Sequence, residues 1–172
     1  MASIIGVENL QHTNGTTAAT IAADGKFTAP NLVMPTGSVI QVQSFNLVNV
    51  RLATSSSSFT ATQLTLNITP ASSSNKIYVS VAGSGNNESA GRGLYYTLYR
   101  NSTDLGGGTS GLGQIYSAAG RVHGAVTVSI LDAPSTTSQV TYTLYIRANG
   151  GTVEFPSSTA ETTTITAMEI AG

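Results

Sequence analysis

Residues 140–147 read Val-Thr-Tyr-Thr-Leu-Tyr-Ile-Arg, a strict alternation of two sets of side chains. Successive side chains of a β-strand point to opposite faces of its sheet, so this pattern predicts a strand with one face in a core. The same period of two recurs at 64–69, 77–81, 94–99 and 126–130. The body of the chain is therefore expected to consist of strands.

Turn residues separate these stretches, and no segment holds the 3.6-residue period of a helix. We expect about eight to ten strands in an antiparallel sandwich or barrel. The strand count, the long polar loops and a final strand at 162–170 favour a jelly roll. The predicted fold class is all-β, an antiparallel jelly-roll sandwich with an N-terminal extended or hairpin arm.

Composition excludes several classes of protein. The 172-residue chain has a net charge of −1, only 9% charged residues and no cysteine. Without a basic stripe, nucleic acid is not an expected partner. The apolar runs are too short for a transmembrane helix or a signal peptide, so no membrane insertion is expected. The absence of cysteine fits assembly in a reducing cytoplasm.

The N-terminal residues have their own pattern. Asp24-Gly25 lies between two short β-like stretches, and this dipeptide favours a tight hairpin because both positions tolerate positive φ. A hairpin of this size is marginal alone in water and must pack on something else. Pro30 and Pro35 indicate a linker after it. We expect an attachment arm and linker at 1–36, with Ile4, Ile5, Val7 and Leu10 as its apolar anchors, and a jelly-roll domain at 37–172.

This segment also carries a resemblance. Residues 6–18 read Gly-Val-Glu-Asn-Leu-Gln-His-Thr-Asn-Gly-Thr-Thr-Ala, and residues 20–25 read Thr-Ile-Ala-Ala-Asp-Gly. Over about its first twenty-five residues the chain resembles fibre-like and head-surface virion proteins of marine tailed bacteriophages, in which such an opening precedes a variable β-rich body. The resemblance implies a structural protein exposed on the surface of a virion that is assembled in the host cytoplasm.

A second resemblance lies at the other end. Residues 164–170, Thr-Ile-Thr-Ala-Met-Glu-Ile, look like the last strand of tumour-necrosis-factor-like jelly rolls. Those domains usually form tight trimers, so this resemblance implies a homotrimer.

Motifs that carry chemistry are weak. Residues 106–111 match G-x-G-x-x-G but precede β or loop sequence instead of a helix, so a flexible loop is favoured over a dinucleotide site. His12 and His123 are too few for a metal site, although a cation on a trimer axis is an alternative. The acidic residues are scattered, and there is no nucleophile elbow. We expect no enzyme activity, no catalytic residues, no metal and no cofactor.

Two surfaces are candidates for contacts. Tyr95, Tyr99 and Tyr145 alternate with the more apolar side of their strands and are a candidate subunit interface, because interfaces favour tyrosine. The alternative is that their rings cover the outside of one sheet. The polar stretch 83–92, with Asn86, Asn87, Glu88 and Arg92, is the candidate recognition loop. The alternative there is a solvated hairpin loop.

Together these features predict a phage virion structural protein, a trimeric capsid decoration or head-surface protein anchored by its N-terminal arm. Its expected partners are two further copies and the major capsid protein or another virion component. The chain is short and has no shaft, which favours head decoration over a tail fibre. The alternative function is a tail-fibre or receptor- or carbohydrate-binding module that takes a host-surface glycan through the loop at 83–92 or at 106–113.

Overall fold

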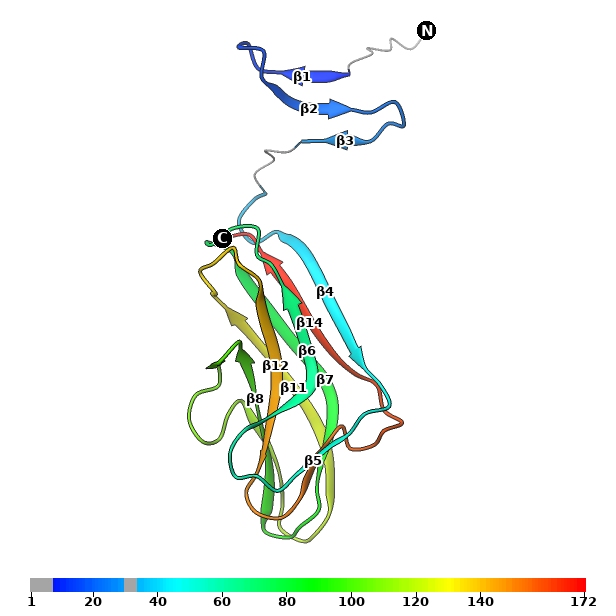
Figure 1. Cartoon of the computed structure of the whole chain (residues 1–172), viewed down its shortest axis with the longest axis vertical. Helices are drawn as coiled ribbons and strands as arrows, with labels where there is room; N and C mark the ends of the chain where they lie inside the picture. Colours follow the sequence, from blue (N-terminus) through cyan, green and yellow to red (C-terminus); the bar gives the residue numbers. More distant parts are fainter. Residues whose placement is uncertain (1–7, 30–33) are drawn as a thin grey trace. The chain divides into compact units, whose positions relative to one another are not determined.

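The computed structural model describes residues 8–29 and 34–172. The chain divides into two compact units, Met1–Pro35 and Thr36–Gly172. All the regular structure of the described residues is β-strand (Figure 1). The expected all-β class is therefore confirmed.

The N-terminal unit is a three-stranded antiparallel sheet in the order β1-β2-β3. Its strands are β1 (Asn9–Gln11), β2 (Thr17–Ile21) and β3 (Phe27–Thr28). Gly15 and Gly25 both have positive φ in the two connecting turns. The side chains of Asn14 and Asp24 accept hydrogen bonds from the amides of Thr16 and Lys26. Each turn thus has a local reason in the sequence, as expected for Asn-Gly and Asp-Gly.

The second unit is a sandwich of two antiparallel sheets. The first sheet has the order β10-β8-β12-β6, with β9 paired to β8. Its strands are β6 (Thr60–Ile68), β8 (Arg92–Arg100), β9 (Thr103–Asp104), β10 (Gly113–Ser117) and β12 (Val140–Ala148).

The second sheet has the order β4-β14-β7-β11 over most of its length, and β13 and β5 continue it beside the end of β7. Its strands are β4 (Val39–Leu47), β5 (Leu52–Thr54), β7 (Lys76–Asn87), β11 (Val122–Asp132), β13 (Val153–Phe155) and β14 (Thr163–Ile170). β4 and β14 come from opposite ends of the unit and lie side by side, drawn cyan and red in Figure 1.

The chain crosses between the sheets repeatedly. It passes from β6 to β7, from β7 to β8, from β10 to β11, from β11 to β12 and from β12 to β14, changing sheet each time. Two antiparallel sheets, each with four main strands (β10-β8-β12-β6 and β4-β14-β7-β11), joined in this way form a jelly roll. The predicted architecture is confirmed.

The core follows the predicted alternation. On β12, Val140, Tyr142, Leu144 and Ile146 are buried, and the intervening side chains are half-buried on the outer face. β14 contributes Ile165 and Ala167 from the opposite sheet. The two inner faces therefore meet as in other sandwiches.

One element differs from the prediction. The stretch from 83 onward was expected to be a long loop, but β7 continues to Asn87 and β8 begins at Arg92. The reason lies in close packing: a Cβ on Gly83 would lie 2.7 Å from Cγ2 of Thr163, and one on Gly85 would lie 3.0 Å from Cδ1 of Leu94. These glycines permit neighbouring side chains to approach the backbone closely inside the sheet. From its polar composition alone, the same stretch was predicted to be a loop.

Candidate functional site

The N-terminal sheet has one apolar face. Leu10 pairs with Ala19 across the strands, and Ile21 pairs with Phe27. Directly paired residues share a face, and Ala19 and Ile21 share one because they are two residues apart on β2. These four side chains therefore lie on the same side of the sheet, while Asn9, Thr20 and Thr28 form the other.

Within residues 8–29, no core lies behind this apolar face. The exposed fractions are 48% for Leu10, 38% for Ile21 and 56% for Phe27. Ala19 is the only buried residue among residues 8–29. Exposed apolar side chains that gather on one face mark a surface for interaction. The described part of the unit therefore exposes an apolar face.

The predicted anchor residues divide into two groups. Ile4, Ile5 and Val7 lie outside the described residues. Leu10 lies on the apolar face, together with Ile21 and Phe27, which were not predicted as anchors. The signal was available, because Ile21 and Phe27 flank the Asp24-Gly25 turn at positions that face one another in a hairpin.

The predicted recognition loop is a tight turn. Asn86 and Asn87 are fully buried, so the prediction that they belong to an exposed loop is wrong. The Asn87 side chain donates to the carbonyls of Ser89 and Arg92 and accepts from the Ser89 amide, which holds the turn closed. Arg92 is exposed and donates to the Asn149 carbonyl at 3.4 Å.

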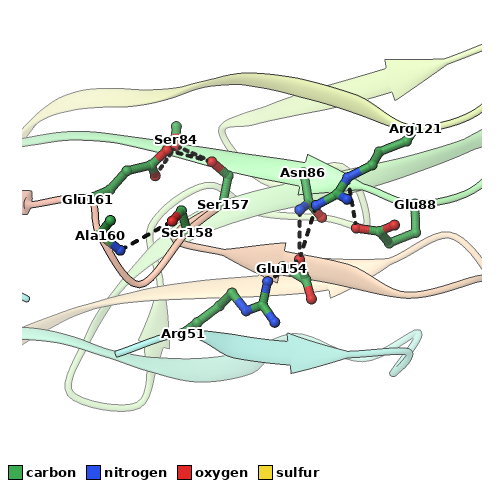
Figure 2. Close-up of polar contacts among 10 residues, drawn as sticks. All are labelled: Arg51, Ser84, Asn86, Glu88, Arg121, Glu154, Ser157, Ser158, Ala160 and Glu161. Carbon is green, nitrogen blue, oxygen red and sulfur yellow. Dashed lines mark hydrogen bonds and ion pairs between the residues drawn. The ribbon is translucent and has the colours of Figure 1, made fainter. Parts of the chain in front are cut away.

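Asn86 belongs to a charged network at this end of the sandwich. Figure 2 shows Glu154 between the side chains of Arg51 and Asn86. Its Oε2 accepts hydrogen bonds from Arg51 at 3.0 Å and from Asn86 at 2.6 Å. Arg121 lies 3.9 Å from the same oxygen and pairs with Glu88 at 3.2 Å. The network joins β7 and β13 to the segments that precede β5 and β11.

The charges of this network balance, with two arginines against two glutamates. The Glu154 carboxylate is largely buried, and its Oε2 contacts Arg51, Asn86 and Arg121, which suits a structural clamp because a buried charge needs a partner. We assign the network to holding the short strands β5 and β13 against β7.

A second polar cluster joins Ser84, Ser157 and Glu161 (Figure 2). Both serine hydroxyls hydrogen bond the Glu161 carboxylate, and they lie 2.8 Å from each other. The Ser84 and Ser157 hydroxyls lower the pKa of Glu161. A lowered pKa weakens a carboxylate as a general base, so these serines gain no activation from it. The cluster fastens the segment between β13 and β14 to β7.

The three predicted interface tyrosines lie on the outer face of the first sheet. The rings of Tyr99 and Tyr145 stack with centroids 4.0 Å apart. The guanidinium carbon of Arg147 lies 4.2 Å from the centroid of Tyr95 and 5.5 Å from that of Phe59. Their role as a subunit interface remains a prediction; their surroundings form an aromatic cluster on the sheet.

A pocket opens beside this cluster. Its volume is about 360 Å³, and it is lined by Ser57, Ser58, Phe59, Tyr99, Gly108, Thr109 and Arg147. The glycine-rich stretch 106–111 supplies part of the wall. It was expected to be a flexible loop, but it packs closely on the sheet: a Cβ on Gly111 would lie 2.5 Å from the Tyr96 carbonyl oxygen and 3.0 Å from Cζ of Phe59.

The outer face of the second sheet is uncharged over three successive rows of paired residues. One row is apolar and crosses four strands: Val42, Met168, Tyr78 and Leu131. Val42 and Leu131 are each 53% exposed. The adjacent rows carry small or polar side chains, namely Ser44, Thr166, Ser80 and Ser129, then Asn46, Thr164, Ala82 and Thr127.

Histidine and acidic side chains do not gather into a metal site. Across residues 8–29 and 34–172, no group of three or more His, Asp or Glu side chains is placed to hold a metal ion. His123 is exposed on β11, opposite Asn86 of β7.

No protein-family model matches the chain, and no curated protein matches it either. Within the described residues, no helix is long and apolar enough to cross a membrane.

Proposed function

We propose that this chain is a structural protein of a bacteriophage virion, a homotrimeric decoration protein of the head surface that attaches through its N-terminal unit. The observation that carries the proposal is the apolar face of Leu10, Ala19, Ile21 and Phe27. A small sheet that exposes its apolar side is stabilised when that side docks on a larger assembly and is removed from water. The resemblance of residues 6–25 to phage virion proteins supports the same role.

The sandwich supports a display role in this proposal. Its core is built from two complete sheets, and its buried carboxylates are engaged in structural contacts. Its described residues offer no activated nucleophile and no metal-binding cluster of acidic and histidine residues. A folded body with these properties suits mechanical duties such as covering or bridging capsomers, and we propose no enzymatic activity for it.

For the trimer, we propose the outer face of the second sheet as the interface. The Val42–Met168–Tyr78–Leu131 row supplies exposed apolar area between flat rows of small side chains. These rows carry no charge, so identical copies meet there without like-charge repulsion. Three linked N-terminal units would make weak individual docking strong through effective concentration.

Deletion tests the attachment role. A protein lacking residues 1–27 should keep the circular dichroism spectrum and mass of the intact oligomer but should no longer bind capsids assembled from the cognate major capsid protein. Full-length protein is the positive control. If the truncated oligomer decorates capsids as well as the full chain, the attachment role is wrong.

The runner-up is a tail-fibre or receptor-binding module. One observation favours a recognition function in addition to decoration: the pocket beside Arg147 has an aromatic wall and a charged side chain. Its ligand is a separate question.

A further inference from the structure

We propose that the pocket lined by Phe59, Tyr99 and Arg147 binds a carboxylate-bearing saccharide. This inference goes beyond attachment to a virion and does not depend on it, since the pocket lies wholly within the sandwich. At about 360 Å³, the pocket is at the small end of the range for ligand sites, suited to one sugar residue or a short piece of a chain.

The aromatic wall gives the first argument. Tyr99 and Phe59 line the pocket, and Tyr145 stacks on Tyr99 and supports it. The face of an aromatic ring carries negative charge density, whereas the C–H bonds of a pyranose carry slight positive charge. The C–H face of a sugar ring can therefore pack against the ring of Tyr99 or Phe59.

Hydroxyl groups at the rim give the second argument. Ser57, Ser58 and Thr109 border the pocket. Within the described part of the chain, the side-chain oxygens of these three residues have no hydrogen-bond partner; only the backbone groups of Ser58 and Thr109 are engaged. Free hydroxyls beside an aromatic surface are complementary to sugar hydroxyls, which both donate and accept hydrogen bonds.

Arg147 determines the charge of the ligand. Three other arginines of the described residues form ion pairs with carboxylates: Arg51, Arg100 and Arg121. In that same part of the chain, Arg147 has none. Its Nε donates to the Thr109 carbonyl at 2.6 Å, and its Nη2 donates to the same oxygen. Its Nη1 makes a long hydrogen bond of 3.5 Å to the Ala148 carbonyl. The guanidinium is thus oriented, and it retains a donor for an anionic group.

The nearby acid does not satisfy this charge. Asp104 lies opposite Tyr99 on the neighbouring strand. Its Oδ1 accepts from the Thr97 hydroxyl at 2.6 Å and from the Gly106 amide at 2.9 Å. These bonds hold the Asp104 carboxylate at the base of the glycine-rich loop. A carboxylate on the ligand is the partner that Arg147 lacks.

The wall of the pocket is preorganised. Leu105 and Leu112 donate to the carbonyls of Leu98 and Tyr96 at 2.9 and 2.8 Å, which ties both ends of the glycine-rich loop to β8. Gly106 and Gly111 lie too close to the sheet for a Cβ. Because the wall is already ordered, ligand binding does not have to offset the entropic cost of ordering this loop.

The test is a titration of full-length protein, followed by ¹H–¹⁵N NMR, with methyl glucuronide, methyl glucoside and inorganic phosphate. We expect methyl glucuronide to bind about tenfold more tightly than methyl glucoside, because one charge-assisted contact is added. The perturbed signals should include the Arg147 side-chain Nε–H and the Thr109 amide.

Variants locate the binding. Arg147→Gln should abolish the preference for the charged sugar, and Tyr99→Ser should weaken both sugars. Lys76→Gln removes one exposed positive charge from the other sheet and should leave binding unchanged. The Arg147→Gln and Tyr99→Ser variants are compared only after circular dichroism shows a native spectrum.

Several outcomes would overturn the proposal. Equal binding of phosphate and methyl glucuronide would make the pocket a general anion site. Wild-type perturbations confined to residues outside the pocket would exclude it, whatever the variants do. Loss of binding in Arg92→Gln with retention in Arg147→Gln would move recognition to the turn between β7 and β8. A failure of these sugars to bind would leave the capsid-binding result of the truncated chain unaffected, so the two proposals fail separately.

Discussion

The hydroxyl of Tyr142 on the first sheet donates a 2.6 Å hydrogen bond to the carboxylate of Asp132 on the second sheet. Arg100 donates to both oxygens of the same carboxylate, at 2.7 and 2.8 Å. Tyr142 is fully buried, so this contact joins the two layers through the core. The alternation at 140–147 predicts that Tyr142 lies on the apolar side of its strand, but it does not identify Asp132 as the buried partner.

Tyr142→Phe should lower the free energy of unfolding by about 1–3 kcal/mol, because the change removes a donor from a buried carboxylate. Urea unfolding at neutral pH measures this. Tyr116→Phe removes a hydroxyl from a tyrosine that is 55% exposed and lies outside the proposed interface, and it should cost much less. Equal losses of unfolding free energy in the two variants would show that the hydrogen bond between Tyr142 and Asp132 stabilises the fold no more than an exposed hydroxyl does.

The same residue predicts alkaline sensitivity. Burial, and then the hydrogen bond to Asp132, raises the pKa of Tyr142 far above its ordinary value of 10.0. The folded state thus favours the neutral phenol. The contribution of Tyr142 to the free energy of unfolding is complete below pH 10 and is lost as the pH rises above the pKa of the unfolded state. Unfolding free energy should therefore fall above pH 10, and less steeply in Tyr142→Phe. Some slope should remain, since burial also raises the pKa values of Tyr96 and Tyr99.

Glu169 predicts sensitivity at the acidic end. Burial by itself would raise the pKa of this carboxyl, but donors from Asn75, Gln41 and the Ala71 amide outweigh it, and the pKa is lowered. Their distances are 2.6, 2.6 and 2.7 Å. The ionised form therefore stabilises the fold above the ordinary pKa of 4.5, and this stabilisation is lost as pH falls below that value.

Glu169→Gln should lower the unfolding free energy by about 1–3 kcal/mol at neutral pH, because the amide places donors against donors. The difference from wild type should shrink below pH 4.5, as measured by urea unfolding across a pH series. Glu8→Gln changes an exposed carboxyl of the N-terminal unit and should leave the sandwich unaffected. A constant difference at every pH would contradict this account of Glu169.

Gly83→Ala tests the close packing inside β7. The added Cβ would lie 2.7 Å from Cγ2 of Thr163, so we expect a loss of about 1–3 kcal/mol from overpacking. Thr163→Ser deletes that methyl group. The double variant should recover much of the loss, and additive costs would mean that Thr163 is not the obstacle.

Leu131→Glu tests the proposed interface. In a trimer it would bring three copies of a charge to an apolar row, so light scattering should show a mass of 17.6 kDa in place of about 53 kDa, three times the chain mass. Tyr116→Glu is the matched control, because Tyr116 is 55% exposed on β10 of the other sheet. Dissociation by Tyr116→Glu alone, or a monomeric wild type, would contradict the interface.

The alternation of side chains was sufficient to predict the sandwich. It identified the inward faces of β12 and β6 because strand periodicity is a local property. It failed at the end of β7, where Gly83 and Gly85 looked like loop residues. These glycines are needed because of close neighbours: Thr163, far along the chain, lies against Gly83, and Leu94, on the opposite sheet, lies against Gly85.

The candidate sites were less predictable. The hairpin turn at Asp24-Gly25 was visible in the sequence, and with it the pairing of Ile21 with Phe27. The pocket was not visible, because Phe59, Tyr99 and Arg147 come from three separate segments. The buried partners of Glu154 and Asp132 were missed for the same reason, since pairing of distant charges is set by tertiary structure.

Attachment through the N-terminal sheet is tested by the affinity of full-length protein for undecorated capsids after a single change on the apolar face of that sheet. Phe27→Ser is compared with Thr28→Ser, the adjacent residue on the opposite face. We expect Phe27→Ser to weaken capsid binding by about tenfold or more through lost apolar burial, with the mass of the oligomer unchanged. Wild-type affinity in Phe27→Ser, or an equal loss in Thr28→Ser, would contradict attachment through this face.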